Sequence, residues 1–200
     1  MNGARLIRYR ELEVTPWKNG LGVTREMVLE PSTQIAAGFR FRVSRAEINM
    51  TAPFSQYPGV RRWLVLAKGG ALELRFGGEP TRQLDRVGEI CAFSGDDVVE
   101  GVPLDGPSED FNLMLADPTL DAELIVRPMV GSMVLFQHAR EWLLFHLLEG
   151  HAAVQGSALS LAVGDSLLFE RRDQDGLAAR LDGSGEALIV RIFDVAQARV

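Results

Sequence analysis

Cysteine and long apolar runs are scarce in this sequence. Its 200 residues include one cysteine, Cys91, which excludes an internal disulfide framework and a cysteine-rich zinc site. Cys91 lies in the apolar run at residues 90–93, which predicts a buried, unreactive thiol. No apolar run approaches the ~20 residues of a membrane span. The charged start at residues 1–10 is not followed by the apolar stretch of a signal peptide. We therefore expect a cytoplasmic protein without a membrane partner.

An excess of positive charge is also missing. Lys and Arg number 21 against 27 Asp and Glu, which gives a formal net charge of −6. Because nucleic acids are polyanions, this balance argues against a nucleic-acid partner. The remaining composition, 46% hydrophobic and 24% charged, is that of a folded globular chain. Its length fits one large domain or two small ones.

Short alternating segments between turn formers are what the sequence has in quantity. It contains 20 glycines and 9 prolines. Residues 71–76 and 40–48 alternate apolar and polar side chains, which predicts β-strands. In the second segment, Arg42 and Ser44 face away from the odd-numbered apolar residues. Residues 182–185, Asp-Gly-Ser-Gly, stand between two apolar runs and predict a hairpin loop.

The same succession of strands occurs twice along the chain. The matched runs are 62–66 and 141–145, 87–93 and 163–169, and 111–114 and 188–191, at offsets of 79, 76 and 77 residues. Two glycine-rich repeats of this size predict an all-β chain of two small barrels or sandwiches. We place the N-terminal half at residues 1–117 and the C-terminal half at 118–200, packed as one globular unit. Six side chains are expected to be largely buried: Trp63, Leu64, Phe93, Trp142, Phe169 and Phe193.

Two segments favour helix by local propensity. Residues 137–149 are rich in helix formers, but the repeat maps this segment onto the strand at residues 62–68, so we predict a strand. Residues 117–121, Asp-Pro-Thr-Leu-Asp, resemble a helix start with proline in the first turn. They predict a helical turn or short helix that links the two halves.

A dense polar cluster lies at residues 15–26. Trp17 offers a flat apolar face, Lys18 a charge, and Asn19 both a donor and an acceptor. The nearby glycines allow the backbone to approach a ligand closely. These features suit a ligand-binding loop. The alternative is a plain connection to the strand at residues 23–28.

Two arginines, Arg61 and Arg62, stand at the start of a predicted strand. Such a pair suits bidentate binding of a carboxylate, and the alternative is an exposed charge pair on a strand edge. Because successive side chains of a strand point to opposite faces, each of several predicted strands has a polar face of its own. If each strand turns that face inward, one cavity collects Glu26, Arg42, Ser44, Arg62 and Asn112, with Trp17, Lys18 and Asn19 at its mouth. The alternative for Asp110 and Asn112 is that they satisfy backbone groups at a strand end.

Four motifs carry a resemblance to a known family. They are Trp-Lys-Asn-Gly at 17–20, Thr-Arg-Glu at 24–26, Pro-Phe-Ser at 53–55 with Pro-Gly at 58–59 and Arg62, and Asp-Phe-Asn-Leu-Met at 110–114. In this order they resemble the signature of the HutD/Ves family over nearly the whole chain. The resemblance implies a bicupin, with two jelly-roll-like β-barrel halves and little helix. It also implies a bacterial protein associated with histidine utilisation that binds a small metabolite.

The residues expected to bind the ligand are Trp17, Lys18, Asn19, Thr24, Glu26, Arg42, Ser44, Arg62 and Asn112. Three cations against one carboxylate make this set locally positive, which favours a small anionic metabolite, a carboxylate. The family association suggests urocanate or formylglutamate.

Signatures of metal and cofactor chemistry are missing. The three histidines, His138, His146 and His151, all lie in the second half and form no His-x-His pair. The sequence has no Gly-x-Ser-x-Gly elbow, P-loop or Cys-x-x-Cys motif. We expect no metal, no cofactor and no catalytic residue. The main hypothesis is a non-catalytic binding or regulatory protein, with a homodimer allowed. The alternative is an enzyme, a metal-independent or cryptically metal-dependent isomerase or hydrolase acting on a histidine-pathway carboxylate.

Overall fold

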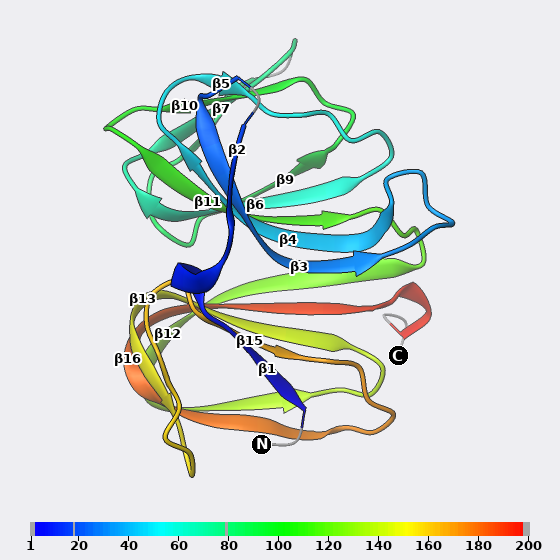
Figure 1. The fold of residues 1–200 in the computed structure, drawn as a ribbon, viewed down its shortest axis with the longest axis vertical. Helices are drawn as coiled ribbons and strands as arrows, with labels where there is room; N and C mark the ends of the chain where they lie inside the picture. Colours follow the sequence, from blue (N-terminus) through cyan, green and yellow to red (C-terminus); the bar gives the residue numbers. More distant parts are fainter. Residues whose placement is uncertain (1–2, 18, 79, 198–200) are drawn as a thin grey trace. The chain divides into compact units, whose positions relative to one another are not determined.

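Two compact units make up the structure, a computed structural model that describes residues 3–17, 19–78 and 80–197 (Figure 1). The N-terminal unit is Leu12–Pro118, and the C-terminal unit combines the residues up to Glu11 with those from Thr119 onward. The start of the chain, which the sequence places in the first half, therefore belongs to the other unit. The reason is strand pairing, since β1 (Ala4–Ile7) pairs antiparallel with β15 (Ser166–Phe169).

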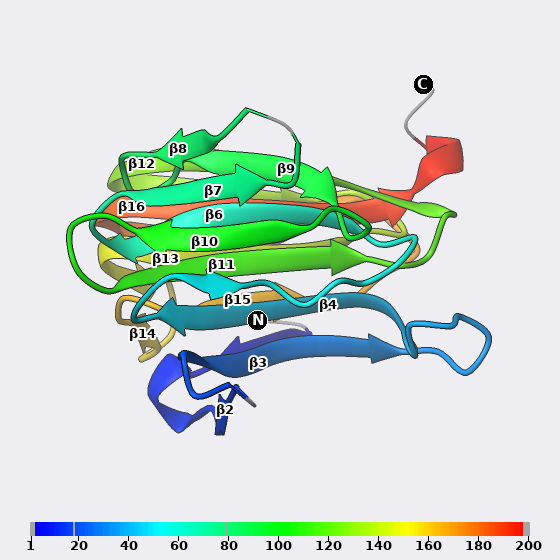
Figure 2. The same ribbon diagram turned by 90° about the horizontal axis from the view of Figure 1, so that it is seen from above.

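The N-terminal unit consists of two antiparallel sheets (Figure 2). The six-stranded sheet has the order β2 (Val14–Pro16), β3 (Gly22–Pro31), β4 (Phe39–Ile48), β11 (Ser108–Leu115), β6 (Arg61–Gly69) and β9 (Ile90–Ser94). The four-stranded sheet has the order β5 (Ala52–Pro53), β10 (Val99–Pro103), β7 (Leu72–Phe76) and β8 (Arg82–Leu84). Leucines of β6 and β7 share one apolar core, so the two sheets face each other.

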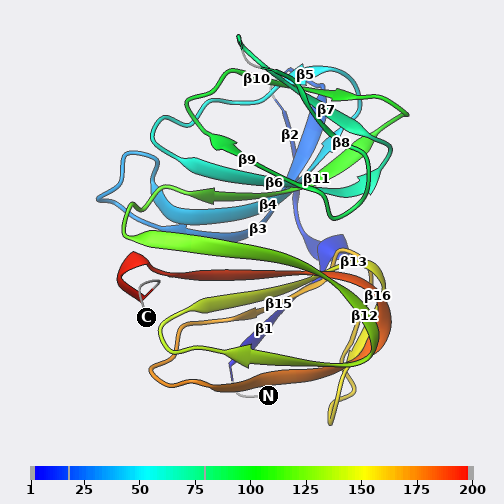
Figure 3. The same cartoon turned by 180° about the vertical axis from the view of Figure 1, so that it is seen from behind.

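The C-terminal unit is built on three long strands that curl at one end (Figure 3). Its sheet has the order β1, β15, β13 (Trp142–Val154), β16 (Gly176–Asp194) and β12 (Leu120–Gln137), and β14 (Ser160–Leu161) pairs with β13. The short 3-10 helices η1 (Tyr9–Glu11) and η2 (Val195–Gln197) belong to the same unit.

The repeat predicted from the sequence is present as a repeated strand order. Strands β9, β6, β11 and β4 lie side by side in the first unit, and β15, β13, β16 and β12 do so in the second. The all-β, cupin-like fold is thus confirmed, although the N-terminal unit is a pair of facing sheets and not a closed barrel. Of the strand predicted at residues 137–149, residues 142–149 lie in β13, as the repeat predicts, whereas residues 138–141 connect β12 to β13 and are not strand. The helix expected at 117–121 is wrong, because Pro118 and Thr119 form a turn and β12 begins at Leu120.

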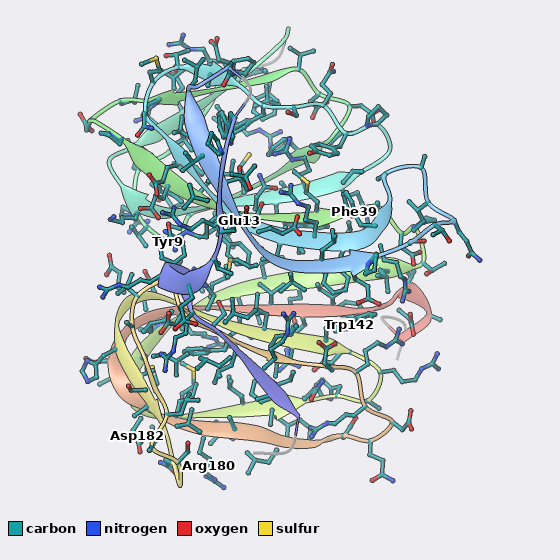
Figure 4. All side chains as sticks on the ribbon, viewed as in Figure 1. Tyr9, Glu13, Phe39, Trp142, Arg180 and Asp182 are labelled. Carbon is teal, nitrogen blue, oxygen red and sulfur yellow. The ribbon has the colours of Figure 1, made fainter. Side chains whose placement is uncertain are left out.

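The hairpin predicted at residues 182–185 is also wrong. β16 runs through this segment, which pairs with β12 on one side and β13 on the other. A Cβ on Gly183 would lie 2.1 Å from the carbonyl oxygen of His151, and one on Gly185 would lie 2.0 Å from that of Glu149. The glycines therefore allow close strand approach where the sheet curls, and do not end the strand. Figure 4 labels Arg180 and Asp182 on this part of β16.

Burial agrees with the sequence for three of the six selected side chains. Leu64, Trp142 and Phe169 are buried, whereas Trp63, Phe93 and Phe193 are only partly buried. Arginines contact two of the latter group. The guanidinium of Arg61 lies 5.7 Å from the centroid of the Trp63 ring, and that of Arg62 lies 4.8 Å from that of Phe93.

Candidate binding site

The inner face of the six-stranded sheet is the face turned toward the four-stranded sheet. Leu64 and Leu66 of β6 define it, because both pack with Leu72 and Leu74 of β7. Side chains alternate between faces, and the strand register carries this assignment from β6 to its neighbours. The polar residues on the inner face are Thr24, Glu26, Arg42, Ser44, Arg62, Asp110 and Asn112. The strand faces predicted from the sequence therefore meet.

Arg62 is the buried cation of this face. It is only 4% exposed, and burial lowers its pKa to about 10, against the opposing attraction of Asp110. Its Nη1 donates to the carbonyl oxygen of Ser55 at 3.2 Å, and its guanidinium lies against the rings of Phe54 and Phe93. Its Nε has no hydrogen-bond acceptor among the described residues. Arg62 is thus not the exposed charge that the alternative interpretation describes.

Asp110 is a member of this face that the sequence analysis did not select. It is fully buried, and neither carboxylate oxygen accepts a hydrogen bond from the described part of the chain. Burial raises its pKa to about 7. The cations of Arg62 and Arg45 and the amide of Asn112 act in the opposite direction, the amide without a well-formed hydrogen bond to either oxygen. The signal that could have identified Asp110 is its place two residues from Asn112 on one strand face.

Asn112 lies between these two charged residues on the sheet. It pairs with Leu64, while Met114 pairs with Arg62 and Asp110 pairs with Leu66. Its side chain is 5% exposed, and its Oδ1 has no donor among the described residues. The proposal that Asp110 and Asn112 satisfy backbone groups is therefore wrong for these oxygens. We call Ser44, Arg62, Asp110 and Asn112 the inner-face cluster.

The residues expected at the mouth have local partners. Trp17 donates from Nε1 to Oγ1 of Thr24 at 2.8 Å, and its ring meets that of Phe54 edge-on. Asn19 is exposed, and its Oδ1 accepts a hydrogen bond from the backbone of Leu21 at 3.0 Å. Lys18 lies outside the described residues.

Arg42 and Glu26 form an ion pair at 2.8 Å, with Glu26 nearly half exposed. The predicted set already counted Glu26, and the structure adds the carboxyl group of Asp110 to this face. Of the described groups, Arg42 and Arg62 supply two positive charges, and Glu26 and ionised Asp110 supply two negative charges. The set is therefore neutral when Asp110 is ionised and positive only when Asp110 is protonated.

The C-terminal unit provides an internal comparison for the inner-face cluster. Arg62 pairs with Phe93 and Met114, and Leu143 pairs with Phe169 and Arg191 in the same arrangement. Leu143 is therefore the structural equivalent of Arg62. The Trp-Leu motifs in the sequence instead align Arg62 with Glu141, two residues earlier. By the same register, the equivalents of Ser44, Asp110 and Asn112 are Ile125, Ala187 and Ile189. All four equivalents are apolar, so this fold does not require the polar cluster.

A surface hollow of about 620 Å³ occurs in the C-terminal unit. It is lined by Val154, Gln155, Gly156, Leu177, Ala178, Ala179 and Arg180. This lining is mainly apolar and small, with one cation and no buried carboxylate, so the hollow offers little chemistry. Among the described residues, no three His, Cys, Asp or Glu side chains gather to hold a metal ion. The residues that the structure describes form no helix that is long and apolar enough to cross a membrane.

Comparison with known proteins supplies the family. The HutD family profile matches residues 9–189. The chain belongs to the HutD family. A Pseudomonas putida relative, named as an uncharacterized 21.2 kDa protein in the hutC 3′ region, is 33% identical over 145 residues, covering 72% of this chain and 74% of the relative. The name of that relative links the family to the histidine-utilisation locus. Protein Ves of Escherichia fergusonii is 33% identical over 106 residues, which cover 52% of this chain and 54% of Ves.

Solved structures extend the likeness over the whole fold. HutD from Pseudomonas fluorescens SBW25 has a TM-score of 0.80 and 26% identity, with 96% of this chain and 98% of that chain covered. A conserved protein of unknown function from Pseudomonas aeruginosa PAO1 has a TM-score of 0.79 and 30% identity, covering 95% and 97%. A bacterial pirin from Escherichia coli, at 10% identity and a TM-score of 0.65 over 96% and 99% of the two chains, shares the fold alone.

Proposed function

We propose that the N-terminal unit of this HutD-family protein binds a small anionic carboxylate of histidine utilisation at the inner-face cluster and acts as a regulatory binding protein. The observation that carries the proposal is the buried Arg62, whose Nε lacks an acceptor on a face shared with Asp110 and Asn112. Buried polar groups are normally hydrogen-bonded, so unpartnered ones point to a binding role. The apolar equivalents in the C-terminal unit support this interpretation.

The unpartnered atoms also define the ligand chemistry. Arg62 offers a donor that suits a carboxylate oxygen. Asp110 and Asn112 offer acceptor oxygens that suit a hydrogen-bond donor on the same ligand. Phe54 and Phe93 flank the guanidinium and supply apolar contact. A small carboxylate that also carries an N–H group satisfies this set, and urocanate and formylglutamate are two such molecules.

The proposal is tested by titration calorimetry of the full chain with urocanate and with formylglutamate. The matched control ligands are the corresponding methyl esters, which lack the anionic charge. The matched control protein is Arg62→Leu, because leucine is the residue that the C-terminal unit carries at this position. We expect binding of at least one acid, weak or no binding of its ester, and loss of binding in Arg62→Leu. Failure of both acids to bind, or equal binding to Arg62→Leu, would contradict the proposal.

A second candidate function is proton transfer on the bound carboxylate, by an isomerase or a hydrolase. The observation that favours it is Asp110, whose burial raises its pKa to about 7, a suitable value for a general acid or base. Overnight incubation of each acid with the protein, followed by product analysis, separates the two functions. Product formation that disappears in Asp110→Asn supports catalysis, and unchanged substrate supports a binding protein.

A further inference from the structure

We infer that a carboxylate ligand enters the inner-face cluster together with one proton, and that Asp110 takes up this proton. The inference rests on the proposed function and adds how binding at that site is regulated. It makes the affinity for the ligand depend on pH in the neutral range.

The inner-face cluster contains one buried cation and one buried carboxyl group, and a bound ligand would add a second carboxylate. Arg62 is 4% exposed and Asp110 is fully buried. Their attraction raises the pKa of Arg62 and lowers that of Asp110, in both cases against the larger effect of burial. A carboxylate bound to Arg62 would share this interior with the carboxylate of Asp110. Two negative charges near one positive charge in a poorly solvated interior are unfavourable, so one of them is neutralised. Protonation of Asp110 achieves this without moving a strand.

Other charged groups near Asp110 do not replace the proton. Arg45 on β4 and Glu109 on β11 influence Asp110, but Arg45 pairs with Glu109, which also accepts a hydrogen bond from the exposed Lys68 at 2.9 Å. On the inner face itself, Arg42 and Glu26 compensate each other.

From the four-stranded sheet, the buried side chains that face the cluster include Leu72, Leu74 and Val99. Arg82, which pairs with Leu74, is an exposed cation at the edge of this core, and its Nη1 lies 3.6 Å from Sγ of Cys91. Cys91 on β9 also faces this core, and burial raises its pKa, which keeps the thiol neutral. Burial raises the pKa of Asp110 to about 7, so this carboxyl group titrates in the neutral range.

The exchange balances in charge and in atoms. Before binding, Arg62 is positive, and near pH 7 the carboxyl group of Asp110 is partly protonated. On binding, a proton from solvent joins one oxygen of Asp110, and the ligand carboxylate becomes the counter-ion of Arg62. The new O–H group donates a hydrogen bond to an acceptor on this face, the Oδ1 of Asn112 or a ligand oxygen. If the acceptor is Oδ1 of Asn112, this oxygen, which has no donor among the described residues, gains one.

The proton count is measured by titration calorimetry in pairs of buffers that differ in ionisation enthalpy. The probe is formylglutamate, whose carboxylates stay ionised from about pH 6 to 9. If the protein binds urocanate alone, urocanate is used above about pH 7.5, where its imidazole stays neutral. We expect uptake of about one proton per ligand at pH 8.5. With formylglutamate, uptake falls toward zero at pH 6, and above about pH 7 the affinity drops about tenfold per pH unit.

Two variants test whether Asp110 is the group that takes up the proton. In Asp110→Asn, binding is expected to occur without proton uptake and with an affinity that is constant across this pH range. In Asp105→Asn, which alters an exposed acid of the same unit, the wild-type proton uptake is expected to persist. The wild-type proton count tests the inference even if Asp110→Asn does not fold.

Binding of the probe by the wild type without proton uptake at pH 8.5 overturns the inference and leaves the proposed function intact. Proton uptake that persists in Asp110→Asn overturns it as well. Failure of both carboxylates to bind at any pH is a different result, because it overturns the proposed function itself.

Discussion

Arg62 and Leu143 occupy equivalent positions in the two units, each paired with a phenylalanine of the adjoining strand, Phe93 for Arg62 and Phe169 for Leu143. One unit therefore buries a cation where the other buries an aliphatic side chain. Since the strand order around both positions is the same, the fold does not require a cation at this position.

Arg62→Ala is expected to weaken carboxylate binding about tenfold to a hundredfold. The reason is the loss of a charge-assisted hydrogen bond, which contributes about 1.5–3 kcal/mol. Calorimetry with the carboxylate that binds wild type measures the change. Arg62→Leu, which refills the space beside Phe54 and Phe93, is expected to keep or raise the melting temperature. Unfolding of Arg62→Leu would show that the guanidinium is structural.

Asp110→Asn is expected to stabilise the protein at pH 8 and to change it little near pH 3. The pKa of Asp110 is raised from 3.8 to about 7, so the folded state holds this proton more tightly than the unfolded state. Its stabilising contribution is complete below the unfolded value of 3.8 and is lost as the pH rises to about 7. At about 1.4 kcal/mol per unit, the loss reaches about 4 kcal/mol at most. Denaturant unfolding at several pH values measures it, with Asp105→Asn as the control. Equal effects of the two variants at pH 8 would contradict the prediction.

Gly183→Ala is expected to destabilise the C-terminal unit by more than about 2 kcal/mol. The added Cβ would lie 2.1 Å from the carbonyl oxygen of His151, a backbone atom that cannot move without disturbing the sheet. Gly77→Ala is the matched control, because its Cβ would meet Val98 at an ordinary 3.5 Å. Thermal denaturation measures both variants. If Gly183→Ala melts at the same temperature as the control, β16 does not approach β13 as closely as described.

Glu26→Gln is expected to change stability by less than about 1 kcal/mol, because an ion pair with a half-exposed partner contributes little. The same change frees the charge of Arg42 on the inner face, so carboxylate binding is expected to tighten several-fold, and more so at low salt. Calorimetry at two salt concentrations checks this result. An unchanged affinity at both would place the ligand out of reach of Arg42.

The alternation of side chains along each predicted strand was sufficient to group the polar residues of this site. Alternation along the strands put Glu26, Arg42, Ser44, Arg62 and Asn112 on matching faces, and the register joins those faces. The internal repeat likewise predicted a strand at residues 137–149 against their helical propensity, and residues 142–149 are strand. Both inferences succeed because side-chain direction in a strand is a local property, and because a repeated motif carries its pairing with it.

Tertiary structure decided what those side chains meet. Local sequence could not show that β1 joins β15, or that Asp182–Gly185 continues a strand, because both depend on partners far along the chain. The same applies to Asp110, whose burial and lack of donors arise from residues on other strands. Its pairing with Leu66 and its electrostatic attraction to Arg62 exist only in the folded sheet. Alternation fixes the direction of a side chain, whereas its solvation and its electrostatic surroundings are set by non-local packing.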